Sequence, residues 1–128
     1  MSKVVLDASA LLALLNQEPG AQLLTPELLR DATASTVNLA EVQTKLVREG
    51  VDPDQAWELV QAPISEAEPF TAEQAEIAGT LVRQTRTLGL SLGDRACLAL
   101  AIFLRAPAYT TDKDWKNLKL GVPIHVLR

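Results

Sequence analysis

Short apolar runs that end at a turn or at the start of a helix recur along this chain and predict five strands. The first, Val4 to Leu6, has consecutive apolar residues with no polar alternation, as expected of a strand that is buried on both faces of a parallel sheet. Four further strands are predicted at residues 32–36, 64–70, 108–111 and 122–127.

Helices are predicted between these strands. Asp7 or Ser9 can cap a helix that ends before Pro19, and Thr25-Pro26-Glu27 begins a short one. The remaining predicted helices start at Asn38, with Asn-x-x-Glu to Glu41, at Asp52-Pro53, at Thr71, which runs to about residue 88, and at Asp94. Alternating strands and helices indicate an α/β fold, with a mostly parallel sheet covered on both faces and a single domain over residues 1–128.

Composition narrows the class of protein. With 128 residues and 48% hydrophobic content, one domain can bury a substantial core. The longest apolar run, Ala96 to Leu104, is too short to cross a bilayer, and no signal peptide is expected, so we expect a soluble protein in the cytoplasm without a membrane partner. The single cysteine, Cys97, excludes an intrachain disulfide and a cysteine-based zinc site. Its apolar neighbours predict a buried, unreactive thiol.

Charge is distributed unevenly between the two parts of the chain. Residues 1–78 carry four basic and thirteen acidic side chains, whereas residues 79–128 carry eight basic and three acidic ones. Such asymmetry is compatible with a basic surface that faces nucleic acid, and equally with a solvated helix face. The candidates for phosphate contact are Arg83, Arg86, Arg95, Lys113, Lys116 and Lys119, of which Arg83 and Arg86 are expected on one face of a helix.

Four acids stand at the end of a predicted strand or at the start of a predicted helix: Asp7, Glu41, Asp94 and Asp112. In a parallel sheet such positions gather at one edge, where ligands of α/β folds bind. Converging carboxylates repel one another unless a cation neutralises them, and oxygen ligands favour Mg²⁺ or Mn²⁺. Such an ion can activate water and stabilise the charge on a phosphodiester. The hydroxyls of Ser9, Thr110 and Thr111 could orient water molecules bound to the metal.

Each acid also has a purely structural interpretation. Asp7 and Asp94 can be helix caps, Glu41 can complete a capping box, and Asp112 or Asp114 can belong to a turn. The residues alone leave both interpretations open.

Four segments of the chain resemble, in order, the four motifs of the PIN-domain family, in particular VapC-type toxins. The segments are VVLDASALLALL, TVNLAEV, LSLGDRACLALA and YTTD, which begin at residues 4, 36, 90 and 109. The resemblance implies a PIN-like three-layer α/β/α sandwich and an endoribonuclease that depends on Mg²⁺ or Mn²⁺. It also implies a homodimer that a cognate antitoxin protein silences.

By motif position, the resemblance assigns catalytic roles to Asp7, Glu41, Asp94 and Asp112. Asp7, Asp94 and Asp112 would bind the metal, with Ser9, Thr110 and Asp114 as auxiliary residues; whether Asp112 or Asp114 is the fourth acid of the site stays open.

Other α/β classes fit less well. A receiver domain needs an acidic pair at its first strand, a haloacid-dehalogenase-like phosphatase needs Asp-x-Asp, and a nucleotide-binding module needs a glycine-rich loop; the chain has none of these. The remaining rival is an inactive PIN-like module that binds RNA or protein. The presence of all four acids argues against it.

Overall fold

A five-stranded parallel sheet forms the centre of the computed structural model, which describes residues 2–128. The strands are β1 (Val4–Leu6), β2 (Ala32–Ser35), β3 (Glu66–Glu68), β4 (Ala108–Thr110) and β5 (Ile124–Val126). Their order across the sheet is β3-β2-β1-β4-β5, and every neighbouring pair is parallel. The predicted α/β class with a mostly parallel sheet is confirmed.

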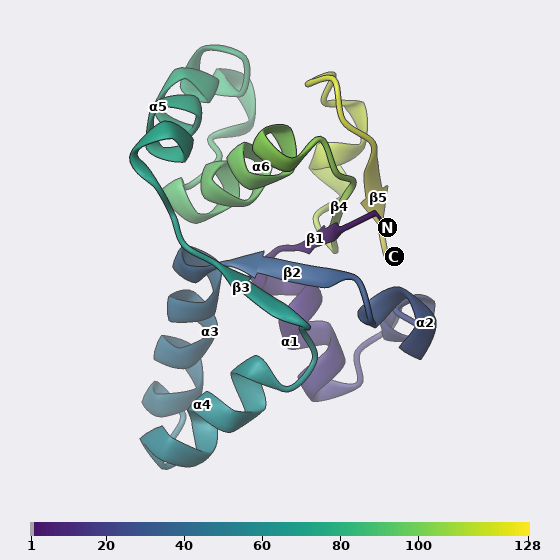
Figure 1. Ribbon diagram of the computed structural model, residues 1–128, viewed down its shortest axis with the longest axis vertical. Coiled ribbons are helices and arrows are strands. Elements are labelled where there is room, and N and C mark those ends of the chain that lie inside the picture. Colours follow the sequence, from purple (N-terminus) through teal and green to yellow (C-terminus); the bar gives the residue numbers. More distant parts are fainter. Residues whose placement is uncertain (1) are drawn as a thin grey trace.

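Helices cover both faces of the sheet and complete a three-layer sandwich (Figure 1). The helices are α1 (Ala8–Asn16), α2 (Pro26–Leu29), α3 (Thr36–Arg48), α4 (Pro53–Gln61), α5 (Ala72–Thr80) and α6 (Leu92–Leu104). Short 3₁₀ turns are η1 (Ala21–Leu23), η2 (Leu81–Arg83), η3 (Arg86–Leu88) and η4 (Lys113–Asn117). Over residues 2–128, no helix has the combined length and apolarity that crossing a membrane requires.

Successive side chains of β1 point to opposite faces of the sheet, and each face is covered by a separate hydrophobic core. Leu6 packs in the core formed with α1, α3 and α4, which includes Leu11 and Leu39. Val5 packs in the opposite core with α6 and Trp115. Because β1 is the middle strand and both of its faces are covered, its side chains are apolar without alternation, and β1 positions whatever follows it at the carboxyl edge.

The start of α3 differs from the prediction. Ser35, not Asn38, is the N-cap, because its hydroxyl accepts a hydrogen bond from the Val37 amide and β2 ends there. Asn38 and Glu41 therefore lie inside the helix, and the predicted Asn-x-x-Glu capping box is wrong. Neither side chain caps the helix, and Asn38 instead donates a hydrogen bond to Glu41.

The helix predicted from Thr71 to about residue 88 is also wrong in length. The α-helix ends at Thr80, and the chain continues through η2 and η3. Residues 80, 82, 85 and 87 are β-branched, which disfavours a helix, and the Thr85 hydroxyl donates to the Leu81 carbonyl at 2.8 Å. Arg83 and Arg86 consequently lie in separate turns rather than on one helical face.

The two tryptophans provide a matched test of the core on the α6 side of the sheet. Trp115 is fully buried, whereas Trp57 on α4 is 40% exposed. Trp115→Ala should lower the free energy of unfolding by about 3–5 kcal/mol because it leaves a large cavity. Trp57→Ala should cost less than about 1 kcal/mol. Urea denaturation followed by circular dichroism measures both, and equal losses would contradict this assignment of the core.

Candidate functional site

The candidate site lies where the strand order reverses. From β1 the chain moves outward through β2 to β3, then returns to β4 on the other side of β1. In such sheets the crevice outside the carboxyl ends of the two strands at the reversal is the usual binding place. Asp7 directly follows β1, and Asp112 follows β4 by two residues. The structure therefore brings these two predicted site residues to the same edge.

Asp7 is a buried acid with three hydrogen bonds. Its carboxylate accepts from the Ala10 amide at 2.8 Å, from the Ser9 hydroxyl at 2.7 Å and from the Thr110 hydroxyl at 2.6 Å. The Ala10 bond makes Asp7 the N-cap of α1. The Thr110 bond ties Oδ2 to β4, and the Ser9 bond, like the Ala10 bond, holds Oδ1 from α1. Asp7 is thus a cap, as its structural interpretation required, but a cap does not require either hydroxyl.

The environment of Asp7 disfavours its charge. Burial raises the pKa of Asp7 to about 6, and the negative charge of Asp94 contributes in the same direction. The hydrogen bonds from Thr110, Ser9 and Ala10 lower the pKa and only partly offset burial. A positive charge placed next to such a carboxylate stabilises its ionised form.

The hydroxyls of Ser9 and Thr110 connect Asp7 to the segment after β4. Ser9 Oγ accepts from the Thr111 amide at 2.9 Å, and Thr110 Oγ1 accepts from the Asp112 amide at 3.1 Å. Asp112 Oδ1 in turn accepts from the Asp114 amide at 2.9 Å and caps η4. Asp112 is directly attached to this network, whereas the Asp114 side chain is exposed and lines a neighbouring cavity.

Asp94 lies in the first turn of α6 and takes part in a capping box. Its amide donates to Ser91 Oγ, and its Oδ2 accepts from the Ser91 amide, each at 3.1 Å. The N-cap is therefore Ser91, three residues before the predicted start. One carboxylate oxygen of Asp94 is used locally, and its charge still acts on Asp7. The structural and functional interpretations of Asp94 are compatible.

Glu41 is held from α3 against the start of α6. Asn38, which is 1% exposed, donates through Nδ2 to Glu41 Oε1 at 2.8 Å and to the Gly93 carbonyl at 3.0 Å. Both partners are acceptors, so the amide nitrogen must face them. The Glu41 side chain itself is exposed at this edge.

Cys97, one turn into α6 from these residues, experiences three of the four acids. Burial is the main reason that the pKa of its thiol is raised, and the charges of Asp7, Asp94 and Glu41 add to the rise. The thiol is fully buried, so it is inert as predicted. These three acids belong to three separate segments of the chain, after β1, on α3 and on α6.

The donor set fits a hard divalent cation better than a zinc ion. Within residues 2–128, no three acidic, histidine or cysteine side chains form a ready-made metal cage. Mg²⁺ does not require one, because it retains several water molecules and binds through one or two carboxylates together with substrate phosphates. Asn38 Oδ1 is buried with no hydrogen-bond partner, which leaves an oxygen acceptor next to the acids. Asp7, Asp94 and Asp112 are the residues that would hold such an ion.

Basic side chains lie beside the acids rather than among them. Lys113 and Lys116 line a cavity of about 480 Å³, together with Asp114 and polar residues of the segment after α5. Arg83 and Arg86 are exposed in that segment. Arg95 differs, because its guanidinium donates to the Ala78 carbonyl at 2.9 Å and so links α6 to α5.

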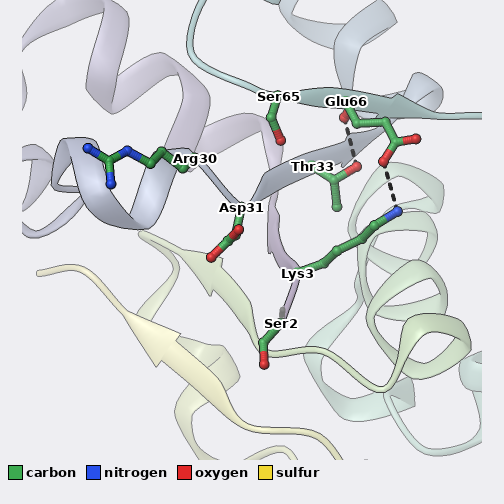
Figure 2. Close-up of a pocket in the computed structure, with 7 residues that line it drawn as sticks. All are labelled: Ser2, Lys3, Arg30, Asp31, Thr33, Ser65 and Glu66. Atoms are coloured by element: carbon green, nitrogen blue, oxygen red, sulfur yellow. Dashed lines mark hydrogen bonds and ion pairs between the residues drawn. The ribbon is translucent and has the colours of Figure 1, made fainter.

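A second hollow, of about 180 Å³, lies at the opposite, amino end of the strands (Figure 2). Lys3 there pairs with Glu66 at 2.8 Å and with Glu68 at 2.7 Å, and the Thr33 hydroxyl donates to the Glu66 carbonyl. Lys3, Thr33, Ser65 and Glu66 in this hollow each take part in a hydrogen bond. It lacks the buried, unmatched charge that distinguishes the carboxyl edge.

Two residues of the site were not predicted from the sequence, Asn38 and Gly93. The Asn38 to Glu41 spacing of three, which brings side chains together on a helix, was the available signal, but it was interpreted as a cap. Nothing in the local sequence shows that Gly93 would lie against Glu41, which is 52 positions earlier in the chain.

Comparisons with known proteins agree with this architecture. The chain is similar in structure to VapBC2 from Rickettsia felis bound to a promoter DNA fragment, with a TM-score of 0.75, 20% identity and 98% of both chains covered. It is similar to DNA-bound VapBC from Salmonella typhimurium, with a TM-score of 0.76, 16% identity and full coverage of both chains. It also resembles Mycobacterium tuberculosis VapC20, described as a Sarcin-Ricin loop cleaving toxin, with a TM-score of 0.73, 21% identity and coverage of 94% and 99%.

A comparison with curated protein sequences gives no match. The sequence profile of the PIN domain matches residues 4–120, which span Asp7, Glu41, Asp94 and Asp112 and most of the chain. Together with the five-stranded parallel sheet, this match shows that the chain belongs to the PIN domain family.

Proposed function

We propose that this protein is an endoribonuclease that depends on Mg²⁺ or Mn²⁺ and acts as the VapC-type toxin of a toxin–antitoxin pair in the cytoplasm. The observation that carries the proposal is the buried Asp7 carboxylate, whose pKa is raised to about 6 at the edge where Glu41, Asp94 and Asp112 also lie. Buried negative charge next to further negative charge is stabilised by a bound cation.

The four acids divide into two roles in this proposal. Asp7, Asp94 and Asp112 would hold the metal, which would supply positive charge to activate water and to stabilise the phosphodiester during displacement. Asn38 occupies Glu41 Oε1, which leaves Oε2 to take the proton of the attacking water. The water oxygen forms the new bond to phosphorus, the bond to the leaving ribose oxygen breaks, and solvent protonates that oxygen.

Substrate binding is assigned to the basic residues next to the acids. Lys113 and Lys116 line the polar cavity beside Asp112, and Arg83 and Arg86 extend the positive surface. Cations in this position would hold phosphates of the RNA strand on either side of the bond to be cut. Arg95 contributes chiefly by fixing α5, because its guanidinium contacts the Ala78 carbonyl.

Partner binding is supported by exposed apolar side chains away from the acids. Val47 on α3 and Trp57 and Leu59 on α4 are 39%, 40% and 45% exposed, and Val82 and Phe103 are 48% and 41% exposed. A contiguous patch of exposed apolar residues is typical of a protein interface, and α3 and α4, which carry three of these side chains, pack against each other. An antitoxin and a second copy of the chain are the partners that the proposed function requires.

The competing proposal is a PIN-like module that binds RNA or protein without cutting it. Such a module would keep the fold and the basic surface, but it would not require a buried Asp7 whose ionised form is destabilised. The two proposals separate in a cleavage assay.

We expect purified protein to cleave RNA with Mg²⁺ or Mn²⁺ and to stop when EDTA is added, since the acids alone cannot stabilise charge on the phosphodiester. Gel analysis of a labelled RNA measures this. Asp94→Asn should be inactive, which excludes a contaminating ribonuclease, whereas Asp54→Asn, an exposed acid on α4, should retain activity. Cleavage that survives chelation, or an active Asp94→Asn protein, would refute the metal mechanism.

Asp7→Asn should abolish cleavage without destabilising the metal-free protein at pH 7.5. The folded-state pKa of about 6 exceeds the ordinary value of 3.8, so the folded wild type binds more protons between these values and loses stability as pH rises. The shift corresponds to about 3 kcal/mol at most, and Asn, an equally good N-cap, does not incur it.

Thermal melts in EDTA between pH 4 and 7.5 measure this difference, which should shrink toward pH 4, where Asp7 is protonated in the folded state and close to half protonated in the unfolded chain. Added Mn²⁺ should stabilise only the wild type, by about 2.7 kcal/mol at a hundred times its dissociation constant. A variant that is less stable than wild type at pH 7.5 would show that the ionised cap outweighs the cost of burial.

Lys113→Ala and Lys116→Ala should weaken RNA binding and reduce the salt dependence of the affinity, because each lost phosphate contact lowers the slope by about 0.7 for a single strand. Fluorescence anisotropy in EDTA, at several salt concentrations, measures the slope without cleavage. Arg30→Ala removes an exposed cation at the opposite end of the strands and serves as the matched control. Identical slopes in all three variants would leave the basic surface without a role in binding.

A further inference from the structure

The first turn of α6 leaves no room for a side chain at position 93. Gly93 is buried, and a β-carbon built on it would overlap the Glu41 carboxylate carbon and both of its oxygens. Gly79 on α5 is the natural contrast, because a β-carbon there would meet nothing within 4 Å. The backbone angle φ of neither glycine lies in the left-handed region, so neither is required by its conformation.

The three atoms nearest to a β-carbon at Gly93 all belong to one flexible side chain, that of Glu41. Glu41 is exposed and reaches this position from α3. An added methyl group can therefore be accommodated if the carboxylate moves away, at little cost to the fold. The absence of a side chain at Gly93 leaves room for the Glu41 carboxylate and is not needed for the stability of α6.

Asn38 holds the same carboxylate from the other side. Its Nδ2 donates both to Glu41 Oε1, at 2.8 Å, and to the Gly93 carbonyl, at 3.0 Å, while its Oδ1 is buried without a partner. One amide group thus ties Glu41 to the backbone of the residue whose missing side chain makes room for it. The start of α6 is capped independently by Ser91.

We infer that Gly93 and Asn38 are positioning residues for Glu41: Gly93 provides the space that its carboxylate occupies, and Asn38 anchors the carboxylate there. The inference rests on the proposed function, in which Glu41 takes the proton of the attacking water. The residues act through Glu41 and have no contact of their own with the reacting atoms.

The decisive comparison is Gly93→Ala against Gly79→Ala. Both replace a helical glycine with a better helix former, so Gly79→Ala should raise the melting temperature of the metal-free protein by a few degrees and leave cleavage unchanged. Gly93→Ala should keep a melting temperature close to that of the wild type but lower kcat about 10- to 100-fold, the range typical of lost support to a site residue. KM for a short RNA should change little.

Removal of the Glu41 side chain tests whether Gly93 acts through it. In a Glu41→Ala background the methyl group has free space, so adding Gly93→Ala should raise the melting temperature as Gly79→Ala does and cause no further loss of kcat. Asn38→Ala should likewise lower kcat in the wild type but not in the Glu41→Ala background. Gln43→Ala, on the same helix but bonded to the Pro53 carbonyl, is the matched control and should leave kcat unchanged.

The outcomes separate the two proposals. Wild-type kcat in Gly93→Ala, or a large fall in melting temperature that persists in the Glu41→Ala background, would overturn the positioning role. If the wild type itself does not cleave RNA with Mn²⁺, the proposed function fails. The thermal melts still report whether the Gly93 methyl group and Glu41 compete for one space.

Discussion

Burial of one carboxylate at the end of the central strand is the constraint on which the rest of this structure depends. Asp7 is 4% exposed, and three hydrogen bonds compensate only part of the cost of removing its charge from water. Two of the donors, Ser9 and Thr110, also bind amides of the segment after β4. The two hydroxyls that stabilise the buried Asp7 carboxylate therefore also fix the backbone of the segment that carries Asp112. At this edge the same hydrogen bonds maintain the local fold and position the candidate site residues.

Capping and site formation coincide because of the geometry of a parallel sheet. Each strand ends where a helix begins, and the unpaired amides of the first helical turn favour acids at the same place. Asp7 caps α1, Asp94 completes the box at α6, and Asp112 caps η4. A structural role for each acid is thus no evidence against a functional one. What distinguishes the site is that burial, and in addition the charge of Asp94 from a different segment, raises the pKa of Asp7.

The start of α6 shows how closely these segments meet. Gly93 is buried against the Glu41 carboxylate, and Asn38 bonds to both residues. This contact joins the N-terminal parts of two helices, although Glu41 and Gly93 are 52 positions apart in the chain. Small residues in α6, such as Ala96 and Cys97, allow its first half to be buried beside the sheet. Burial, and in addition the negative charges of Asp7, Asp94 and Glu41, raises the pKa of the Cys97 thiol.

The sequence alone determined the class of fold and the acids that lie at its carboxyl edge. An apolar run such as Val4 to Leu6, followed by an acid and a helix signal, is a local pattern that can be recognised in the sequence. In a parallel sheet all strands run in one direction, so the acids that follow them lie at the same edge. The alternation of elements required a parallel sheet, and the order of its strands was left to the tertiary structure.

Helix boundaries were less determined, because competing local bonds decide them. Ser35 rather than Asn38 caps α3, and the Thr85 hydroxyl takes part in ending the helical region after α5.

Only the tertiary structure could decide the contacts between distant segments. The bond from Thr110 to Asp7 and the fit of Glu41 against Gly93 join residues far apart in the chain, and a linear pattern carries no information on such distances. The raised pKa of Asp7 follows from the same cause, since burial is a property of the packed fold and not of the residue.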